Sequence, residues 1–589
     1  MANLLKAGLA AGMGLALTSF STERGFPEEV LAAMDPTAVA QALCGGRDGG
    51  SGLAARTLIA SAFAAPATEA GPIPLYPDLV NSPFPLTSSN DRARRYFSQG
   101  LLLSYGFNHA GAVRSFREAQ RLDPACAMCW WGEAVALGPN INAPMDDRDR
   151  EAALDAMDRA MALRGRASPL ERALIEAVAV RYSRDPAADR AALDAAYADA
   201  MLKVAASFPA DDDVAVLAAE AAMNTTPWNY WEADRKTPIG RSGEAIRLVE
   251  LVQARNPDHV QAIHLAIHLL EASDPGRAEA AADRLARPLA PSAAHLVHMP
   301  GHIYYARGRY ADSMRVNVAA ARADEAYFRS AGDNGLVRYG YYPHNIHFIV
   351  TSAQMAGDMP TAIREAQRLR TVLDPATSAK IAWIQAIDAA PYLAMAQFAA
   401  PRAILAMPEP DPRLPYARAM RHYARAVAHA ERKDHAAFDK ELSAIDRIAA
   451  SGDLDGLVAQ GMPAPDLLAL AQAVARGRLA MRSGDHAGAA EHFRTAIGIE
   501  SRLPYQEPPY WYYPVRQSLG AALFLAGRYD DASKEFRDAL VQTPHNGWAL
   551  YGLARSEEAL RHRLEAAAAR RALSKAWVGD PALLKMERL

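Results

Sequence analysis

The chain of 589 residues contains only three cysteines, Cys44, Cys126 and Cys129. So few cysteines exclude a small scaffold held together by many disulfides. Basic residues number 64 and acidic residues 67, which leaves a formal net charge of only −3. Because the charges balance and no basic run stands out, the composition lacks a nucleic-acid footprint, and we expect no nucleic-acid partner.

Long apolar runs are also missing. Outside the N-terminus no segment is apolar enough to cross a bilayer, so we expect no transmembrane span. The sequence has no Gly-rich phosphate loop, no nucleophile elbow and no zinc-protease helix motif. No standard enzyme motif therefore identifies a reaction.

Residues 1–70 differ from the rest and are predicted to be a leader or a disordered N-terminus. Lys6 and the apolar run that follows it resemble the charged and hydrophobic regions of a secretory signal. Arg56 precedes a second such run, which ends in a small-x-small cleavage pattern before Ala65. We expect an exported protein of the periplasm or cell envelope; the alternatives are a start site assigned too far upstream and a cytoplasmic protein.

The remainder of the chain repeats itself. Three segments share a glycine followed at fixed offsets by alanine, phenylalanine and alanine: Gly100, Ala112, Phe116 and Ala119; Gly477, Ala489, Phe493 and Ala496; Gly520, Ala532, Phe536 and Ala539. Four glycines recur in phase as turn markers: Gly308, Gly357, Gly484 and Gly527. These are the small, aromatic and turn positions of the tetratricopeptide (TPR) repeat of about 34 residues.

Alanine-rich helical periodicity between these markers predicts helices nearly throughout. The fold class is therefore an all-α, TPR-type solenoid of helical hairpins in two lobes. We assign residues 71–370 to an N-terminal TPR lobe with a histidine-rich groove. Residues 371–470, rich in proline near their middle, are an irregular helical connector, and residues 471–589 form C-terminal TPR repeats.

Histidines gather in one part of the chain. Seven of the sixteen lie within 84 consecutive residues: His264, His268, His295, His298, His302, His344 and His347. Spacings of three, four and seven residues stack side chains on one face of a helix. The repeat register places these faces on the first helices of three successive hairpins, which line the concave groove of TPR proteins. We therefore expect the three sets to share a cavity.

Imidazole is the commonest side-chain ligand for zinc, copper and similar ions. An all-imidazole set argues against magnesium and calcium, so we expect a transition metal, copper first, then zinc or iron. Binding should weaken as the histidines protonate, at roughly pH 6.5. The alternative is that backbone and tyrosine groups satisfy these histidines without a metal. Pro300 and Gly301 interrupt the helix that carries three of them, which predicts a kink or a helix start there.

Other residues are candidates for the site. Glu271, one turn beyond His268, and Asp324 are the candidate catalytic carboxylates. Residues predicted to line a ligand groove are Asn140, Asn142, Trp228, Trp231, Tyr304 and Tyr342. Cys126 and Cys129 form a redox pair, a short disulfide that clips a turn, or two small apolar residues in a helix seam.

Several strings of the chain are similar to a family of bacterial TPR-repeat proteins. They are Tyr105-Gly-Phe-Asn-His-Ala110, Cys126-Ala-Met-Cys-Trp-Trp-Gly132, Gly138-Pro-Asn-Ile-Asn-Ala143, His298-Met-Pro-Gly-His302 and Tyr342-Pro-His-Asn-Ile-His347. The resemblance runs from about residue 75 to the C-terminus. It implies a TPR fold and often an export signal, but no particular activity.

Three functions fit these observations. The first is a TPR binding protein whose groove holds a transition metal together with a peptide, protein or small-molecule ligand. The alternative is a metal-dependent enzyme, an oxidoreductase or a hydrolase, built on the same scaffold. The third is a purely structural assembly factor with incidental histidines.

Overall fold

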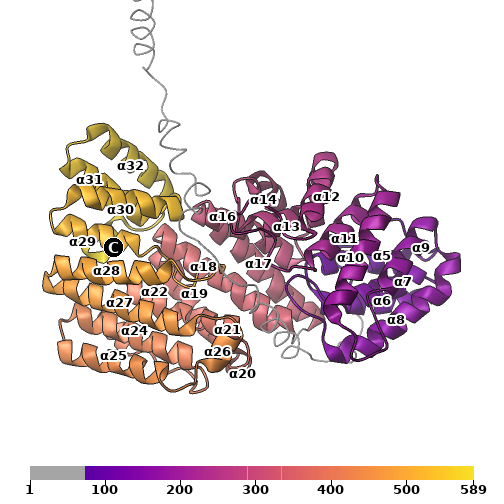
Figure 1. Ribbon diagram of the computed structural model, residues 1–589, viewed down its shortest axis with the longest axis horizontal. Helices are drawn as coiled ribbons and strands as arrows, with labels where there is room; N and C mark the ends of the chain where they lie inside the picture. Colours follow the sequence, from indigo (N-terminus) through magenta and orange to yellow (C-terminus); the bar gives the residue numbers. More distant parts are fainter. Residues whose placement is uncertain (1–72, 288, 333–334) are drawn as a thin grey trace, which may run out of the picture.

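The computed structural model describes residues 73–287, 289–332 and 335–589, and over these ranges the chain is helical without a strand. Within these ranges an isolated β-bridge joins Trp231 and Pro238 in the loop between α11 and α12. Successive helices pack as hairpins, which stack into two groups joined through α16, α17 and α18 (Figure 1). The all-α solenoid of TPR-type hairpins is confirmed. The leader segments near Lys6 and Ala65 lie outside the described residues.

Six hairpins lead from the N-terminal side to the centre. Their helices are α5 (Asp91–Tyr105), α6 (His109–Leu122), α7 (Ala127–Ala136), α8 (Arg150–Leu163), α9 (Pro169–Ala179), α10 (Arg190–Ser207), α11 (Asp212–Met223), α12 (Ser242–Arg255), α13 (Val260–Leu270), α14 (Glu279–Leu285), α15 (Ala294–His298), α16 (Pro300–Ala306) and α17 (Tyr310–Ala331). In the sixth hairpin α15 and α16 together take the place of one first helix.

The second half continues the stack. Its helices are α18 (Tyr342–Ala356), α19 (Met359–Val372), α20 (Pro375–Ser378), α21 (Ala382–Ile387), α22 (Ala390–Phe398), α23 (Pro401–Leu405), α24 (Pro415–Glu431), α25 (His435–Ala449), α26 (Asp455–Ala459), α27 (Ala464–Ser483), α28 (His486–Glu500), α29 (Arg516–Leu525), α30 (Tyr529–Gln542), α31 (Gly547–Ala559) and α32 (Arg563–Ala576). A π-helical turn, Val337–Tyr341, leads into α18.

The repeated glycines allow the helices of a hairpin to approach each other. A Cβ on Gly100 would lie 2.7 Å from the Phe116 ring, and one on Gly477 would lie 2.5 Å from Phe493. Real Cβ atoms do not come this close, so the aromatic ring of the second helix fits only against a glycine of the first. The spacing recognised in the sequence is thus a packing rule.

The turn glycines have a different role. Gly308, Gly357, Gly484 and Gly527 all have positive φ, between 72° and 82°. This left-handed conformation ends the first helix and is costly for any residue with a Cβ. It explains why glycine recurs in phase at these positions.

Buried hydrophobic side chains form two clusters, one extending from Ile73 to Tyr341 and the other from Tyr305 to Leu589. The last repeats return to the centre: the Trp548 indole donates a hydrogen bond to the Gln354 carbonyl at 3.0 Å. The division of the cores thus lies near α17 and α18. The lobe limits proposed at residues 370 and 470 stay predictions.

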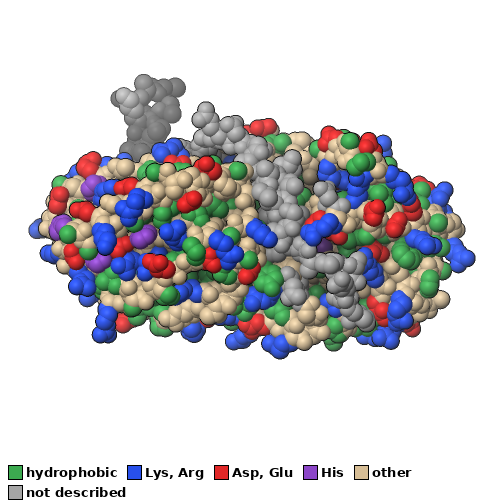
Figure 2. Space-filling model, turned by 90° about the horizontal axis from the view of Figure 1, so that it is seen from below, with side chains coloured by type: hydrophobic (Ala, Val, Ile, Leu, Met, Phe, Trp, Pro, Cys, Tyr) green, Lys and Arg blue, Asp and Glu red, His purple; other side chains and the backbone are tan. Residues whose placement is uncertain are grey.

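No helix in the described part of the chain is both long and apolar enough to span a membrane. Basic and acidic side chains intermingle over the face shown in Figure 2. This mixture agrees with the near-zero net charge.

Candidate metal centre

Six of the seven histidines lie next to one another where α13, α15, α16 and α18 meet. They form two sets, which we call the first triad (His264, His268 and His295) and the second triad (His298, His302 and His344). Within each triad one ring nitrogen from every residue lies within 4.8 Å of the other two. The sequence-predicted convergence therefore holds for six residues.

In the first triad, His264 and His268 stand one turn apart on α13 and their Nε2 atoms are 3.0 Å apart. The His295 ring, from α15, lies 5.0 Å from that of His264, centroid to centroid. The Nε2 atom of His295 is buried and makes no hydrogen bond. Three imidazole nitrogens thus face a common point in the interior.

Acceptors behind the first triad fix which nitrogen carries the proton. The Gln261 amide donates through Nε2 to the Glu220 carboxylate at 2.9 Å, so its Oε1 faces Nδ1 of His264 at 3.1 Å. The Glu271 carboxylate lies 3.0 Å from Nδ1 of His268. These acceptors favour the tautomer in which both Nδ1 atoms donate, and in that tautomer the two Nε2 atoms present lone pairs to each other.

The second triad repeats this arrangement. The Nε2 atoms of His298 and His302 are 2.7 Å apart, and the ring centroid of His344 lies 4.9 Å from that of His298. Nδ1 of His298 lies 2.6 Å from Oδ1 of Asn317, whose amide nitrogen donates to the Ser313 carbonyl at 2.8 Å. Nδ1 of His298 therefore carries its proton.

Two carboxylates face His302. Its Nδ1 atom lies 2.8 Å from Oε2 of Glu271 and also contacts Oε2 of Glu507, on the loop between α28 and α29. Burial lowers the pKa of His302, but the two carboxylates outweigh burial and raise the pKa to about 10. In the protein without an ion, the His302 ring is thus protonated on both nitrogens at neutral pH. The proton on its Nε2 lies between this atom and Nε2 of His298.

Burial dominates the remaining imidazoles. It lowers the pKa of His264, His268 and His295 well below the usual value, and neighbouring imidazoles lower it further. Burial has the same effect on the pKa of His298 and His344. These side chains are therefore neutral at pH 7, the form in which imidazole binds a metal.

Each triad has an aromatic wall. The Phe107 ring lies 4.6 Å from His264 and 5.2 Å from His295, and the Phe348 ring lies 4.8–5.0 Å from all three rings of the second triad. Trp228, which is 45% exposed, covers His268 at 5.0 Å. Phe107 has positive φ, 53°, and occupies the turn position at which other repeats carry glycine; Trp228 also has positive φ, 64°.

The interruption at Pro300 and Gly301 separates α15 from α16, as the sequence predicted. Proline occupies the first position of α16, where its missing N–H is not needed. A Cβ on Gly301 would lie 2.5 Å from the Asn317 amide nitrogen. Glycine here therefore lets Asn317 reach His298.

The other predicted residues are less central. His347 points to the second lobe, where its Nε2 lies 2.7 Å from the Tyr512 hydroxyl. Asp324 accepts a hydrogen bond from Asn345 at 2.7 Å and borders a small cavity that reaches His295. Glu271 alone among the candidate catalytic residues contacts both triads.

The groove candidates are scattered. Asn142 donates to the Tyr341 hydroxyl at 3.3 Å, and the Tyr341 ring lies 4.9 Å from His295, so this residue reaches the rim of the centre. Trp228 covers His268, as described above. The other four candidates are bonded elsewhere: Asn140 to His109, Trp231 to the Leu269 carbonyl, Tyr304 to Asp283, and Tyr342 to Glu325 and Arg368.

Sequence reasoning missed the residues that orient the histidines. Gln261 precedes His264 by one turn and could have been found by the same helical spacing. Asn317 lies on the second helix of its hairpin, and Glu507 is 205 residues from His302. The only sequence signal near Glu507 is the proline- and aromatic-rich segment that follows it.

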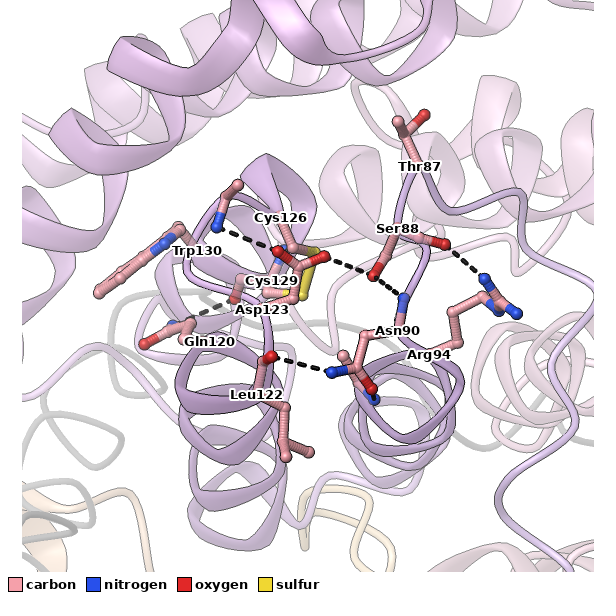
Figure 3. The surroundings of a disulfide bond; sticks show 12 residues. Thr87, Ser88, Asn90, Arg94, Gln120, Leu122, Asp123, Cys126, Cys129 and Trp130 are labelled. Atoms are coloured by element: carbon pink, nitrogen blue, oxygen red, sulfur yellow. Dashed lines mark hydrogen bonds between the residues drawn. A yellow bond between two sulfur atoms is a disulfide. The ribbon is translucent and has the colours of Figure 1, made fainter.

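Cys126 and Cys129 form a disulfide at the start of α7, which agrees with a redox pair or a short clip and not with two separate apolar residues. Both side chains are buried. Asp123 accepts a hydrogen bond from Ser88, and the Asn90 amide donates to the Leu122 carbonyl, so residues before α5 lie close to this turn (Figure 3).

No protein-family model and no curated protein match this chain. Among solved structures, the human IFIT1 dimer with m7Gppp-AAAA is 11% identical, covers 81% of this chain and 95% of its own, and has a TM-score of 0.31. The P58(IPK) TPR domain is 11% identical, covers 80% of this chain and 99% of its own, and has a TM-score of 0.20. At such scores neither structure informs the function. The likeness to bacterial TPR-repeat proteins stays a prediction.

Proposed function

We propose that the protein is a TPR-type solenoid that binds a transition-metal ion at the histidine centre. The observation that carries this proposal is the pair of Nε2 atoms of His264 and His268, 3.0 Å apart in the interior. Gln261 and Glu271 hold the proton of each ring on the opposite nitrogen. Two lone pairs therefore face each other.

This arrangement favours a cation. With the ring protons on Nδ1, neither Nε2 atom has a proton to donate, and the two lone pairs repel each other. Burial lowers the pKa of both rings, so protonation does not relieve the repulsion at neutral pH. An ion between the rings would convert both lone pairs into ligands, and the outer acceptors match the partners that metal-bound imidazoles normally have.

The donor set selects the class of metal. Neutral imidazoles suit copper, zinc and iron, and copper is our first choice, followed by zinc or iron. The carboxylates of Glu271 and Glu507 lie on the outer nitrogens of His268 and His302, which suits a role in orientation and charge compensation. Calcium and magnesium prefer oxygen ligands and are not proposed.

A metal-dependent enzyme, an oxidoreductase or hydrolase, is a second candidate. Catalytic zinc sites use three protein ligands and leave a position open, and each triad supplies three. One small cavity borders His295, Asp324 and Tyr341, and another borders His344, Glu507 and Tyr510. Each cavity has room for about one water molecule, so water or a ligand of similar size would reach the triads through them.

Export to the periplasm or cell envelope remains part of the proposal. A disulfide between Cys126 and Cys129 is typical of an oxidising compartment, which supports it.

The test is metal retention. Purified full-length protein would be stripped with chelator, incubated with copper, zinc or iron in turn, desalted and subjected to elemental analysis. We expect retention by the wild type and by His562→Ala, which changes an exposed histidine outside the centre. We expect loss in His268→Ala/His298→Ala, with the helical circular dichroism retained. A wild type that retains no ion would contradict the proposal.

A further inference from the structure

We infer that the centre is binuclear, with one transition-metal ion held by the first triad and a second ion held by the second triad. This inference rests on the proposed function and adds the number of ions and the ligands of each. The two triads lie side by side, so the two ions would belong to one centre.

The triads do not share a ligand. Each provides three imidazoles with their own convergent nitrogens, and each contains one facing pair of Nε2 atoms, His264 with His268 and His298 with His302. An ion bound between one pair of Nε2 atoms does not coordinate the other pair. A single ion would therefore leave one triad without a metal.

Each triad also has its own supporting residues. Gln261 orients His264 in the first, and Asn317 orients His298 in the second. Phe107 closes the first triad and Phe348 the second. Because hydrogen-bonded outer partners and an apolar wall are the usual surroundings of one metal, their duplication indicates two metals.

The triads are close neighbours. Ring centroids of His295 and His298 are 5.9 Å apart, and those of His268 and His302 are 6.2 Å apart. Glu271 joins the triads, because Oε1 lies 3.0 Å from Nδ1 of His268 and Oε2 lies 2.8 Å from Nδ1 of His302. One buried carboxylate thus positions a ligand of each ion.

Charge supports the same number. Burying a cation is costly unless a negative charge lies nearby. Glu271 contacts both triads and Glu507 contacts the second, so a carboxylate lies beside the ligands of each ion.

Stoichiometry tests the inference. Metal-free full-length protein would be titrated with zinc, and separately with copper(I), and the tightly bound ions counted after desalting. We expect two ions per chain in the wild type and in His562→Ala. We expect one in His264→Ala/His268→Ala and one in His298→Ala/His344→Ala, because each pair of changes removes two of three ligands from one triad.

The outcomes separate the two proposals. One ion in the wild type, lost in either double variant, would indicate a single shared site; the inference would fail while the proposed function stood. No ion in the wild type would overturn both. If a double variant does not fold, as judged by circular dichroism, the wild-type count still decides the inference.

Discussion

The two triads contain the same ligands but obtain their orientation from different parts of the chain. In the first, Gln261 and Glu271 lie on α13 or at its end, within three residues of the histidines they orient. In the second, Asn317 comes from α17 and Glu507 from beyond α28. In the first triad, His264 and His268 are thus oriented by residues of their own helix and α15 adds His295. The second triad is completed only when the second lobe packs against the first.

The triads also differ in charge. The first triad is neutral, because burial lowers the pKa of all three imidazoles. In the second, Glu271 and Glu507 overcome burial and raise the pKa of His302 to about 10. An ion entering the first triad meets only lone pairs, whereas an ion entering the second must displace a proton.

The largest effect is expected for Glu271→Gln, because Glu271 is the residue common to both triads. The amide has the same shape, but it loses the charge and presents N–H groups to one of the two Nδ1 donors. Loss of such an outer partner costs about 10- to 100-fold in metal affinity. We expect a loss of this order at both triads, measured by competition with a chromophoric chelator. A change confined to one triad would contradict the shared role of Glu271.

Glu507→Gln separates the triads. Among the triad histidines Glu507 forms an ion pair with His302, and Glu271 lies beside the same nitrogen. We expect an affinity loss of up to about tenfold for the ion of the second triad and no change for the first. The single-site proteins His264→Ala/His268→Ala and His298→Ala/His344→Ala, each carrying Glu507→Gln, allow the two affinities to be measured apart. Equal losses of metal affinity in the two single-site proteins would contradict a role of Glu507 at the second triad alone.

Gly301→Ala tests the support from α17. The added methyl would lie 2.5 Å from the Asn317 amide nitrogen, so Asn317 must move away from His298. We expect a stability cost of about 1–3 kcal/mol from overpacking and weaker binding at the second triad. Gly498→Ala is the control, since its Cβ would meet no atom within 4 Å. Unchanged metal affinity in Gly301→Ala would contradict the claim that Asn317 orients His298 for metal binding.

Proton release distinguishes the triads by the pH dependence of their metal affinities. His302 is protonated below a pKa of about 10, so binding at the second triad releases a proton and its affinity should rise about tenfold per pH unit between pH 7 and 9. The first triad stays neutral because its pKa values are lowered, so its affinity should be flat over this range. Calorimetry in buffers of different ionisation enthalpy measures the protons released. A metal affinity of the second triad that does not change with pH would contradict the protonation of His302.

The fold was predictable because its signals are local. Gly100 and Phe116 lie on the two helices of one hairpin, and the required close contact appears in the sequence as a fixed offset. Histidines of one helix were found in the same way, since a turn of helix brings His264 beside His268. Pro300 and Gly301, at the start of α16, predicted a break in the helix. Only the structure shows that Gly301 makes room for Asn317.

The rest of the centre depends on contacts between distant segments. Glu507 reaches His302 across 205 residues, and no periodicity records such a contact. His347 has the same helical spacing as the ligands, yet it pairs with Tyr512 because its face of α18 meets the second lobe. Spacing predicts which side chains share a helix face, whereas the packing of the lobes decides which of them share a site.

The most direct test of a metal between His264 and His268 is a crystal structure of zinc-loaded protein with an anomalous difference map at the zinc edge. The account predicts a peak between the two Nε2 atoms, each at about 2.0–2.1 Å from the ion, with Glu271 still bonded to Nδ1 of His268. An empty map there in protein that contains zinc, with the two Nε2 atoms still facing each other, would contradict the central claim.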